Sequence, residues 1–396
     1  MVENKTAPLM TKIVLLLSAN WVIMAGAALS PAMPAMMAAY ASLTNADVWV
    51  PMILTFPALF IALGGPIAGY LADKLGRKWI LLLSSLLAGL SGAAGYFLVG
   101  FGPLLISRAL LGLGIAGATT ATNALIADTF EGQERAKFMG LYTAFGGLGG
   151  VIFLPLGGMI ADINWRLSFL LYLPALVLFV LGIFSVQESK VIPSDHALTG
   201  RATLKLNPTL FSIFITAFLF QFSFLTLPIY FAPFLQFLMG LSSYHIGLMG
   251  AVGAIFSFLG GIVYDSISKR LNFRNMNLLA LISVSIGFIV LGFAKSIILI
   301  IISQIILGFW AGVVLSNLPT WLVSLVRIEV RGRASGIYVT MMFIGQILTA
   351  LIFAPIIRIS GFHMAYFVSA GIMILVGLVG FIAQKDKGHL KEKGLM

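Results

Sequence analysis

The sequence predicts an all-α integral membrane protein with twelve transmembrane helices in two pseudo-symmetric six-helix bundles. Of the 396 residues, 60% are hydrophobic and only 9% are charged, whereas soluble proteins carry about 25% charged residues. At about 20 apolar residues per span, the chain has room for about a dozen spans and little else. Short motifs also recur in the two halves of the chain at a nearly constant offset, which indicates a duplicated six-span unit.

The spans follow from the apolar stretches between polar loops. Several of these stretches are longer than one membrane crossing needs, so we expect tilted or kinked helices. Prolines within them, such as Pro31, Pro34 and Pro228, each remove a helix hydrogen bond. The predicted spans are 12–40, 48–72, 79–100, 103–127, 136–161, 166–187, 208–235, 242–264, 275–295, 297–325, 334–357 and 362–384.

The basic residues orient these spans. The formal net charge is +11, from 24 Lys and Arg against 13 Asp and Glu. A basic soluble protein would suggest nucleic acid, but here the charges mark cytoplasmic loops. With the N-terminus inside, twenty of the 24 fall on the cytoplasmic side, and Arg166, Lys295 and Arg358 fall outside. Both termini are therefore expected in the cytoplasm, and nucleic acid is not expected as a partner.

The composition excludes several kinds of site. The chain has no cysteine, so it offers no thiolate for catalysis or metal binding. Its four histidines are scattered, and no GxxxxGK[ST] loop is present. We therefore expect no enzymatic activity, no metal and no cofactor, with a proton gradient as the energy source.

A polar linker at 188–207 divides the chain into an N-terminal bundle, 1–187, and a C-terminal bundle with a short basic tail, 208–396. GYLADKLGRK begins at Gly69 and GIVYDSISKR at Gly261, so glycine, acid and base recur 192 positions later. Arg135 and Arg331 each precede a glycine by five residues, at an offset of 196. A substrate site near the membrane midplane between the halves is the usual consequence of such repeats.

On these residues the chain resembles the major facilitator superfamily. GYLADKLGRK fills every fixed position of that family's signature loop, G-x-L-x-D-x-x-G-R-K. The resemblance implies a cytoplasmic gate, with Asp128 at the end of span four as the partner of Arg77; the alternative is ordinary positive-inside anchoring. The candidate gating residues are Gly69, Asp73, Gly76, Arg77, Lys78, Asp128 and Asp265.

Three further stretches resemble the twelve-span drug–proton antiporter branch of the family. They are LSPAMP from Leu29, RALLGLG from Arg108 and GVIFLPLGG from Gly150. The last departs from the branch pattern GP-x-x-GG, because Leu154 replaces the glycine and one residue is missing before Gly157. Because of this departure, the motif does not distinguish an exporter from an importer.

Arg108 is the only charge within a predicted span, and no acid lies at mid-membrane. A charge there costs about 3 kcal/mol on insertion scales and indicates function in coupling or substrate binding; the alternative is a snorkelling anchor. An unpaired Arg108 favours a neutral or anionic substrate; alternatively, the substrate itself offsets the charge of Arg108. Polar residues on spans that line the family's cavity, together with Gln346, are substrate-cavity candidates, although interhelical hydrogen bonds would also explain them. These candidates are Asn20, Thr119, Asn123, Gln221, Trp310, Asn317 and Gln346.

The sequence therefore predicts a secondary transporter that works by alternating access. The first interpretation is a proton-coupled exporter of a small amphipathic drug or metabolite. The second is an importer of an organic anion or siderophore-like metabolite, and a membrane enzyme or lipid flippase is a third class. We expect a monomer in the bacterial inner membrane whose partners are a small-molecule substrate and lipids.

Overall fold

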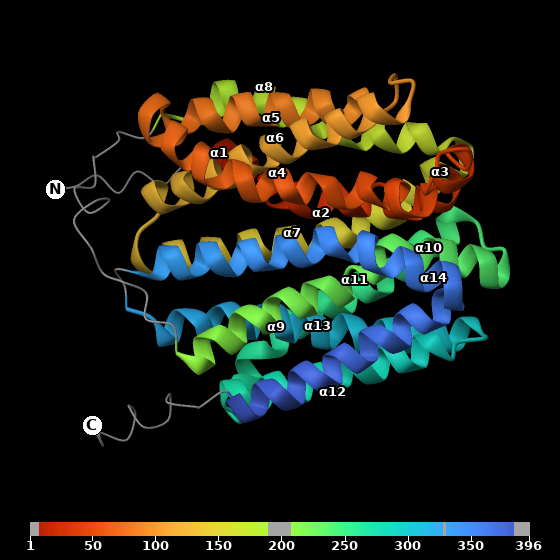
Figure 1. Cartoon of the computed structure of the whole chain (residues 1–396). Coiled ribbons are helices and arrows are strands. Elements are labelled where there is room, and N and C mark those ends of the chain that lie inside the picture. The colour runs from red at the N-terminus through yellow and green to blue at the C-terminus, as the bar shows by residue number, and fades with distance from the viewer. Residues whose placement is uncertain (1–7, 189–206, 328–329, 384–396) are drawn as a thin grey trace, which may run out of the picture. The chain divides into compact units, whose positions relative to one another are not determined.

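Residues 8–188, 207–327 and 330–383 are described by the computed structural model in Figure 1, and within them the chain forms helices and no strands. The predicted linker (except its end residues) and most of the basic tail lie outside the described residues. The helices of the first half are α1 (Leu9–Leu17), η1 (Ser18–Asn20), α2 (Trp21–Ala27), η2 (Ser30–Ala32), α3 (Met33–Ala39), α4 (Ala46–Leu75), α5 (Arg77–Ala94), α6 (Phe101–Thr129), α7 (Gly132–Ile163), η3 (Trp165–Tyr172) and α8 (Pro174–Ser185). Those of the second half are α9 (Pro208–Phe224), α10 (Thr226–Met239), α11 (Ser243–Ser268), α12 (Phe273–Gly292), α13 (Ile297–Leu325) and α14 (Arg331–Ala383).

The helices agree with the twelve predicted spans, and the two differences in the count have structural explanations. By length and hydropathy, 10 helices in the described residues are able to cross a membrane. The long helix α14 contains two of the predicted spans, joined at Gly361, whose φ of 79° breaks the helical geometry. The other missing span is α5, which begins with Arg77 and Lys78. Counting α14 as two spans and adding α5 restores twelve.

Prolines lie at the second interruption of span one and near the break in span seven. Span one runs from Leu9 to Ala39 but changes from α to 3₁₀ geometry at η1 and η2, and Pro31 lies in η2. Span seven breaks at Leu225, three residues before Pro228. Proline has no N–H to donate, so a carbonyl one turn earlier loses its partner. Beside this break the Thr226 hydroxyl donates to the Ser223 carbonyl at 2.7 Å.

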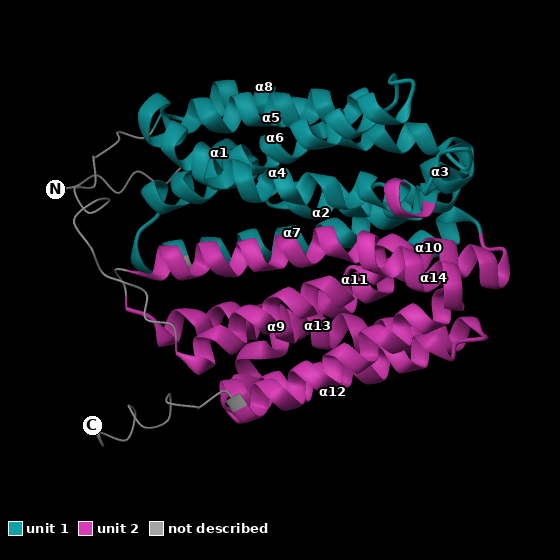
Figure 2. Cartoon of the chain, viewed as in Figure 1, with its two compact units in different colours: residues 1–46, 50–194, 242–247 teal, residues 47–49, 195–241, 248–396 magenta. Residues whose placement is uncertain are grey.

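The chain divides into two compact units (Figure 2). Unit 1 comprises 1–46, 50–194 and 242–247, and unit 2 comprises 47–49, 195–241 and 248–396. In unit 1, α5 packs on α6 and α8, and α2 packs on α7; in unit 2, α12 packs on α13 and α14, and α9 packs on α14. The same span pairs therefore recur in both units, as a duplicated six-helix bundle requires. Each unit also includes the first turn of a helix that continues in the other unit.

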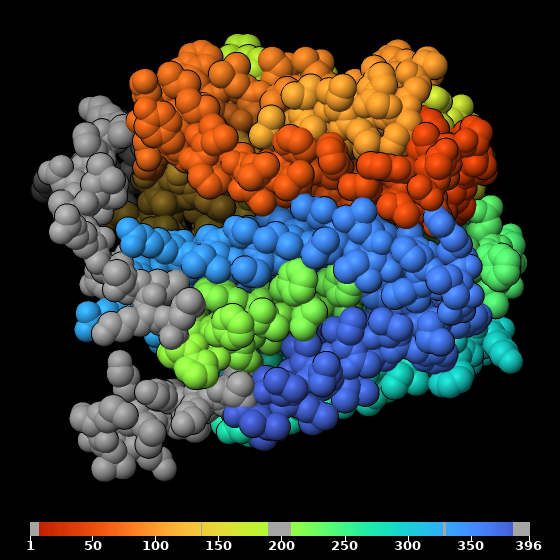
Figure 3. All heavy atoms as spheres, viewed as in Figure 1, coloured from red at the N-terminus to blue at the C-terminus, as the bar shows by residue number. Residues whose placement is uncertain are grey.

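The surface of each unit is apolar along its helices. On the face shown in Figure 3, α4 and α5 form much of the surface of unit 1, and α14 forms much of that of unit 2. Large apolar side chains are exposed on these helices, among them Leu63 and Ile67 of α4 and Leu83 of α5. Monomeric soluble proteins rarely expose apolar area on this scale. The exposed side chains are those of a protein that faces lipid.

Candidate functional site

The predicted signature loop joins α4 to α5 and is held by an ion pair. Gly76 ends α4 with φ +99° and ψ 143°, a conformation that favours glycine. Arg77 follows at the start of α5, and its Nη1 forms an ion pair with Asp128 of α6. The same nitrogen donates to the Ala124 carbonyl at 3.3 Å. The pairing of Arg77 with Asp128 is confirmed, while its role in gating stays a prediction.

Glu188 is a partner of this loop that sequence reasoning missed. Its Oε1 accepts a hydrogen bond from the backbone N–H of Lys78 at 3.3 Å. The Lys78 ammonium donates to the Ile183 carbonyl near the end of α8, at 3.0 Å. Glu188 thus supplies negative charge at the N-terminus of α5, where helix N–H groups lack intrahelical partners. In the sequence Glu188 is only the first polar residue of the linker, and nothing there signals this contact.

The remaining loop residues are more open. Asp73 is exposed, and Gly69 lies opposite Thr120, where an added Cβ would be 3.9 Å from its methyl group. In the repeat copy, Asp265 bonds Lys269 four residues later at 2.6 Å, on the exposed side of α11. The acid of the second copy therefore pairs locally, with a lysine one residue past the end of α11, whereas Arg77 in the first copy pairs with Asp128 of α6.

Arg108 is fully buried inside unit 1. Its Nη2 donates to the Gly92 carbonyl at 2.7 Å and to the Ser91 carbonyl at 3.2 Å. Its guanidinium carbon lies 4.8 Å from the ring centroid of Phe169 and 5.1 Å from that of Tyr172. Backbone oxygens and aromatic faces, both negative, surround the cation.

The two carbonyls that Arg108 binds belong to the last turn of α5. The last four carbonyls of a helix have no intrahelical partner, and the helix dipole places negative charge there. A buried cation at this end therefore satisfies two of these carbonyls and offsets their partial charge. The geometry makes Arg108 a cap that joins α6 to α5. Its role in coupling or substrate binding stays a prediction.

The cavity candidates of unit 1 differ in their surroundings. Asn20 is half-buried in η1, and its Nδ2 donates to the Leu17 carbonyl at 3.3 Å. The Thr119 hydroxyl donates to the Ile115 carbonyl of its own helix at 2.8 Å. Asn123, one turn further along α6, is exposed. Of these three side chains, Asn123 is the most accessible.

Among the candidates of unit 2, Asn317 has the most complete set of partners. It is fully buried, and its Nδ2 donates to the Phe273 carbonyl of α12 at 3.1 Å. This bond joins α13 to α12, the interhelical role expected as the alternative to cavity lining. Trp310, Gln221 and Gln346 are half-buried. Their role in a cavity stays a prediction.

The sequence matches the family model described as Major Facilitator Superfamily over residues 15–297 and 246–395. These matches span nearly the whole chain and include both copies of the repeated motif. The chain belongs to the major facilitator superfamily. It is therefore a secondary transporter embedded in the membrane and not an enzyme, as the sequence predicts.

Two curated members of the superfamily resemble the chain over most of its length. Multidrug resistance protein MdtG of Klebsiella pneumoniae (strain 342) is 27% identical over 343 residues, which cover 83% of this chain and 82% of the relative. MdtG of Salmonella typhi is also 27% identical, with 83% of each chain covered.

Solved structures of other superfamily transporters share the fold. A mutant of the nucleoside transporter NupG matches with a TM-score of 0.81 at 11% identity, over 94% of this chain and 100% of that one. A D-xylose–proton symporter matches with a TM-score of 0.79 at 16% identity, over 94% and 97%.

Proposed function

We propose that this superfamily member exports small amphipathic compounds in exchange for protons, as a monomer in the bacterial inner membrane with both termini in the cytoplasm. The observation that carries the proposal is the similarity to MdtG, a multidrug resistance protein, over 83% of the chain. The complete signature loop and its ion pair at Arg77 support an alternating-access carrier. The excess of Lys and Arg in alternate loops supports the orientation.

The surroundings of Arg108 favour export of amphipathic compounds over import of an anion. The guanidinium is fully buried and has carbonyl and aromatic partners within unit 1. These partners offset part of its charge without a substrate anion, although Nη1 is buried with no hydrogen-bond partner among the described residues. That importer remains an outcome of the test below.

We place the transported proton at the inner end of unit 1. Asp73 is exposed there, and Asp128 is paired with Arg77. Protonation of Asp128 would remove its charge and release Arg77, which couples proton binding to the signature loop. The acids of unit 1 in the described chain lie at helix ends or in loops, so no acid at mid-membrane competes for this role.

The test is flux into proteoliposomes of a lipophilic cationic dye and of an organic anion, with and without an imposed pH gradient. We expect dye movement only when protons flow in the opposite direction, and loss of that coupling in Asp128→Asn. Glu134→Gln, an exposed acid in the first turn of α7, is the matched control and should transport normally. Movement of the anion with an inert dye would refute the proposal in favour of import.

A further inference from the structure

The inner ends of the two units, where the signature loop and its repeat copy lie, differ in charge. In unit 1, segments 73–82 and 128–137 contain five basic and four acidic residues, a net charge of +1. The repeat-equivalent segments of unit 2, 265–274 and 324–333, contain six basic and two acidic residues, a net charge of +4. The number of basic residues is therefore nearly the same, and most of the difference lies in the acids.

Three acids of the first copy have no acidic counterpart 196 positions later. The pairs of equivalent residues are Asp128 and Ser324, Glu131 and Arg327, and Glu134 and Val330. The second copy gains one acid, Glu329, which lies outside the described residues. Orientation in the membrane follows Lys and Arg, and acids contribute little to it. The positive-inside rule therefore explains the bases of both units but not the loss of acids from unit 2.

Contacts within unit 2 bring the basic segments to one end of the unit. The ring of Phe273, at the start of α12, stacks on that of Trp321 in α13 with centroids 5.9 Å apart. Arg274 donates from Nε to the Phe381 carbonyl near the end of α14 at 2.6 Å. The end of α11 precedes α12 by a short loop, and the start of α14 follows α13 in the same way. The bases of both segments therefore gather at the inner end of unit 2.

Of the six bases at this end, five are exposed and one is half-buried. The exposed bases are Lys269, Arg270, Arg327, Arg331 and Arg333, and the half-buried base is Arg274. In the described part of the two segments Asp265 is the only acid, and it pairs with Lys269 at 2.6 Å. In unit 1, by contrast, Asp128 pairs with Arg77. Acids of the same segments therefore leave most of the positive charge of unit 2 uncompensated.

The bases adjoin the apolar surface of the same helices. Ile337 of α14 is exposed four residues after Arg333, and Ile262 of α11 is exposed seven residues before Lys269. Residues four or seven apart lie on one face of a helix, and four residues span about 6 Å along its axis. A phospholipid whose acyl chain covers Ile337 therefore has its headgroup near the level of Arg333.

We propose that the inner end of unit 2 is a docking surface for the headgroups of anionic phospholipids such as phosphatidylglycerol. Phosphate oxygens accept hydrogen bonds from Arg and Lys, and bases near a membrane surface attract anionic lipids. The apolar side chains beside the bases favour a lipid over a soluble polyanion, which has no acyl chain to cover them. The leaflet involved, that facing the cytoplasm, rests on the proposed orientation.

The test is photolabelling of the full chain in vesicles that contain phosphatidylglycerol or phosphatidylcholine with a diazirine near the start of one acyl chain. The labelled positions are mapped by tandem mass spectrometry in two repeat-equivalent segments, 334–341 of α14 and 138–145 of α7. Leu141 is exposed like its equivalent Ile337, so the two segments are matched. Both leaflets contain the labelled lipid, so the orientation of the protein in the vesicle does not affect the result.

We expect the ratio of phosphatidylglycerol to phosphatidylcholine labelling to be about five-fold higher at 334–341 than at 138–145. This is the factor that one additional base near a membrane surface supplies. At about 1 M salt the difference should largely disappear, because exposed charges are then screened. Phosphatidylcholine, which carries the same phosphate but no net charge, reports the contribution of the acyl chains alone.

Exposed residues of the two copies provide matched variants. Arg327→Gln with Arg331→Gln should lower the ratio at 334–341 to about that at 138–145. Arg135→Gln with Lys137→Gln removes the same charge from the first copy and should leave the ratio at 334–341 unchanged. Glu131→Arg, which gives the first copy the residue of the second, should raise the ratio at 138–145 about two- to five-fold. All five side chains are exposed, so the fold should be retained.

Equal ratios at the two segments of the wild type, or no response to Arg327→Gln with Arg331→Gln, would overturn the docking surface. Binding of soluble polyphosphate to unit 2 in the same vesicles would then favour a soluble polyanion instead. Labelling needs neither transport nor a substrate. Proton-coupled dye flux with equal ratios therefore refutes the docking surface alone, and unequal ratios without such flux refute the proposed export alone.

Discussion

Arg108→Met tests whether this buried cation holds unit 1 together. Methionine keeps much of the volume but loses two hydrogen bonds to carbonyls, at 2.7 and 3.2 Å, each worth about 1.5–3 kcal/mol from a charged donor. The contacts with the two aromatic rings add about 2 kcal/mol at a desolvated site. Removing a charge from the membrane returns about 3 kcal/mol. The expected net loss of stability is about 2–5 kcal/mol.

The assay is the apparent melting temperature of the purified protein, followed by tryptophan fluorescence at one fixed heating rate. At about 2–4 °C per kcal/mol for a unit of this size, Arg108→Met should melt about 5–15 °C below the wild type. Arg108→Lys, which keeps the charge but not the planar fork, should fall between the two.

Arg166→Met is the matched control for this measurement. Arg166 also donates to a carbonyl, that of Leu98 at 2.8 Å, and lies over the ring of Trp165 at 4.6 Å, but it is only half-buried. Its loss should cost less than about 1 kcal/mol, because partly exposed charges gain little from pairing. If Arg108→Met melts with the wild type while transport stops, the capping role is refuted and coupling or substrate binding is favoured.

Three further substitutions probe the loop and the packing of unit 2. Gly76→Ala should cost about 1–3 kcal/mol in thermal unfolding, because φ +99° strains any side chain and the new Cβ would lie 2.6 Å from a carboxylate oxygen of Glu188. Asn317→Ala should cost about 1–3 kcal/mol in the same assay, since it leaves the Phe273 carbonyl without its side-chain donor. Asp128→Asn should lower the free energy of unfolding by no more than about 1 kcal/mol, the value of a partly exposed ion pair. A much larger loss of stability would indicate a structural role for Asp128 and contradict a gating role.

The sequence predicts the spans well because membrane insertion depends on length and apolar composition. The predicted span 297–325 coincides with α13, and 48–72 lies within α4. The pairing of Arg77 with Asp128 is also predictable, since the positive-inside rule and the span ends place both residues at one membrane surface. The spans depend on local sequence, and the membrane surface at which each span ends follows because successive spans cross in opposite directions.

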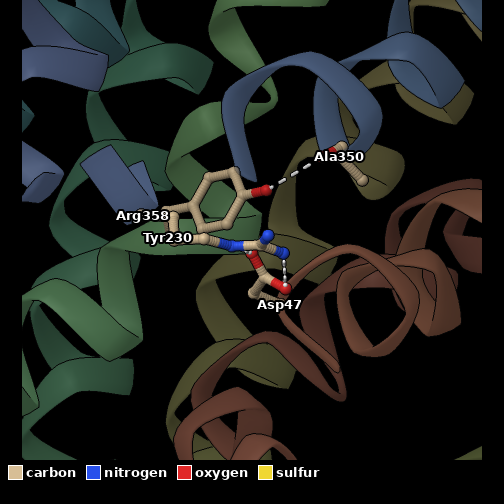
Figure 4. A network of polar contacts seen from close by, with 4 residues as sticks. All are labelled: Asp47, Tyr230, Ala350 and Arg358. Carbon is tan, nitrogen blue, oxygen red and sulfur yellow. Dashed lines mark hydrogen bonds and ion pairs between the residues drawn. The ribbon is translucent and has the colours of Figure 1, made fainter. Parts of the chain in front are cut away.

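Contacts between side chains and backbone groups cannot be predicted from the sequence. The partners of Arg108 are carbonyls at the end of α5, and every helix end has such carbonyls whatever its sequence. The cap that Asp162 provides for α11 is hidden for the same reason. Asp47 and Arg358 are 311 residues apart, so no local sequence pattern predicts their ion pair (Figure 4).

The two copies of the repeat share their helix packing but differ in a charged contact at the inner end. At the inner end, the offset of 196 places Ser324 where the first copy has Asp128, and the Ser324 hydroxyl bonds a carbonyl of its own helix at 2.7 Å. Lys269 then has only Asp265, four residues away, as its described ion-pair partner. Apolar packing between helices tolerates many substitutions, whereas an ion pair needs both partners. The position equivalent to Asp128 therefore carries no acid in the second copy, which is why we assign the proposed proton sensitivity to unit 1.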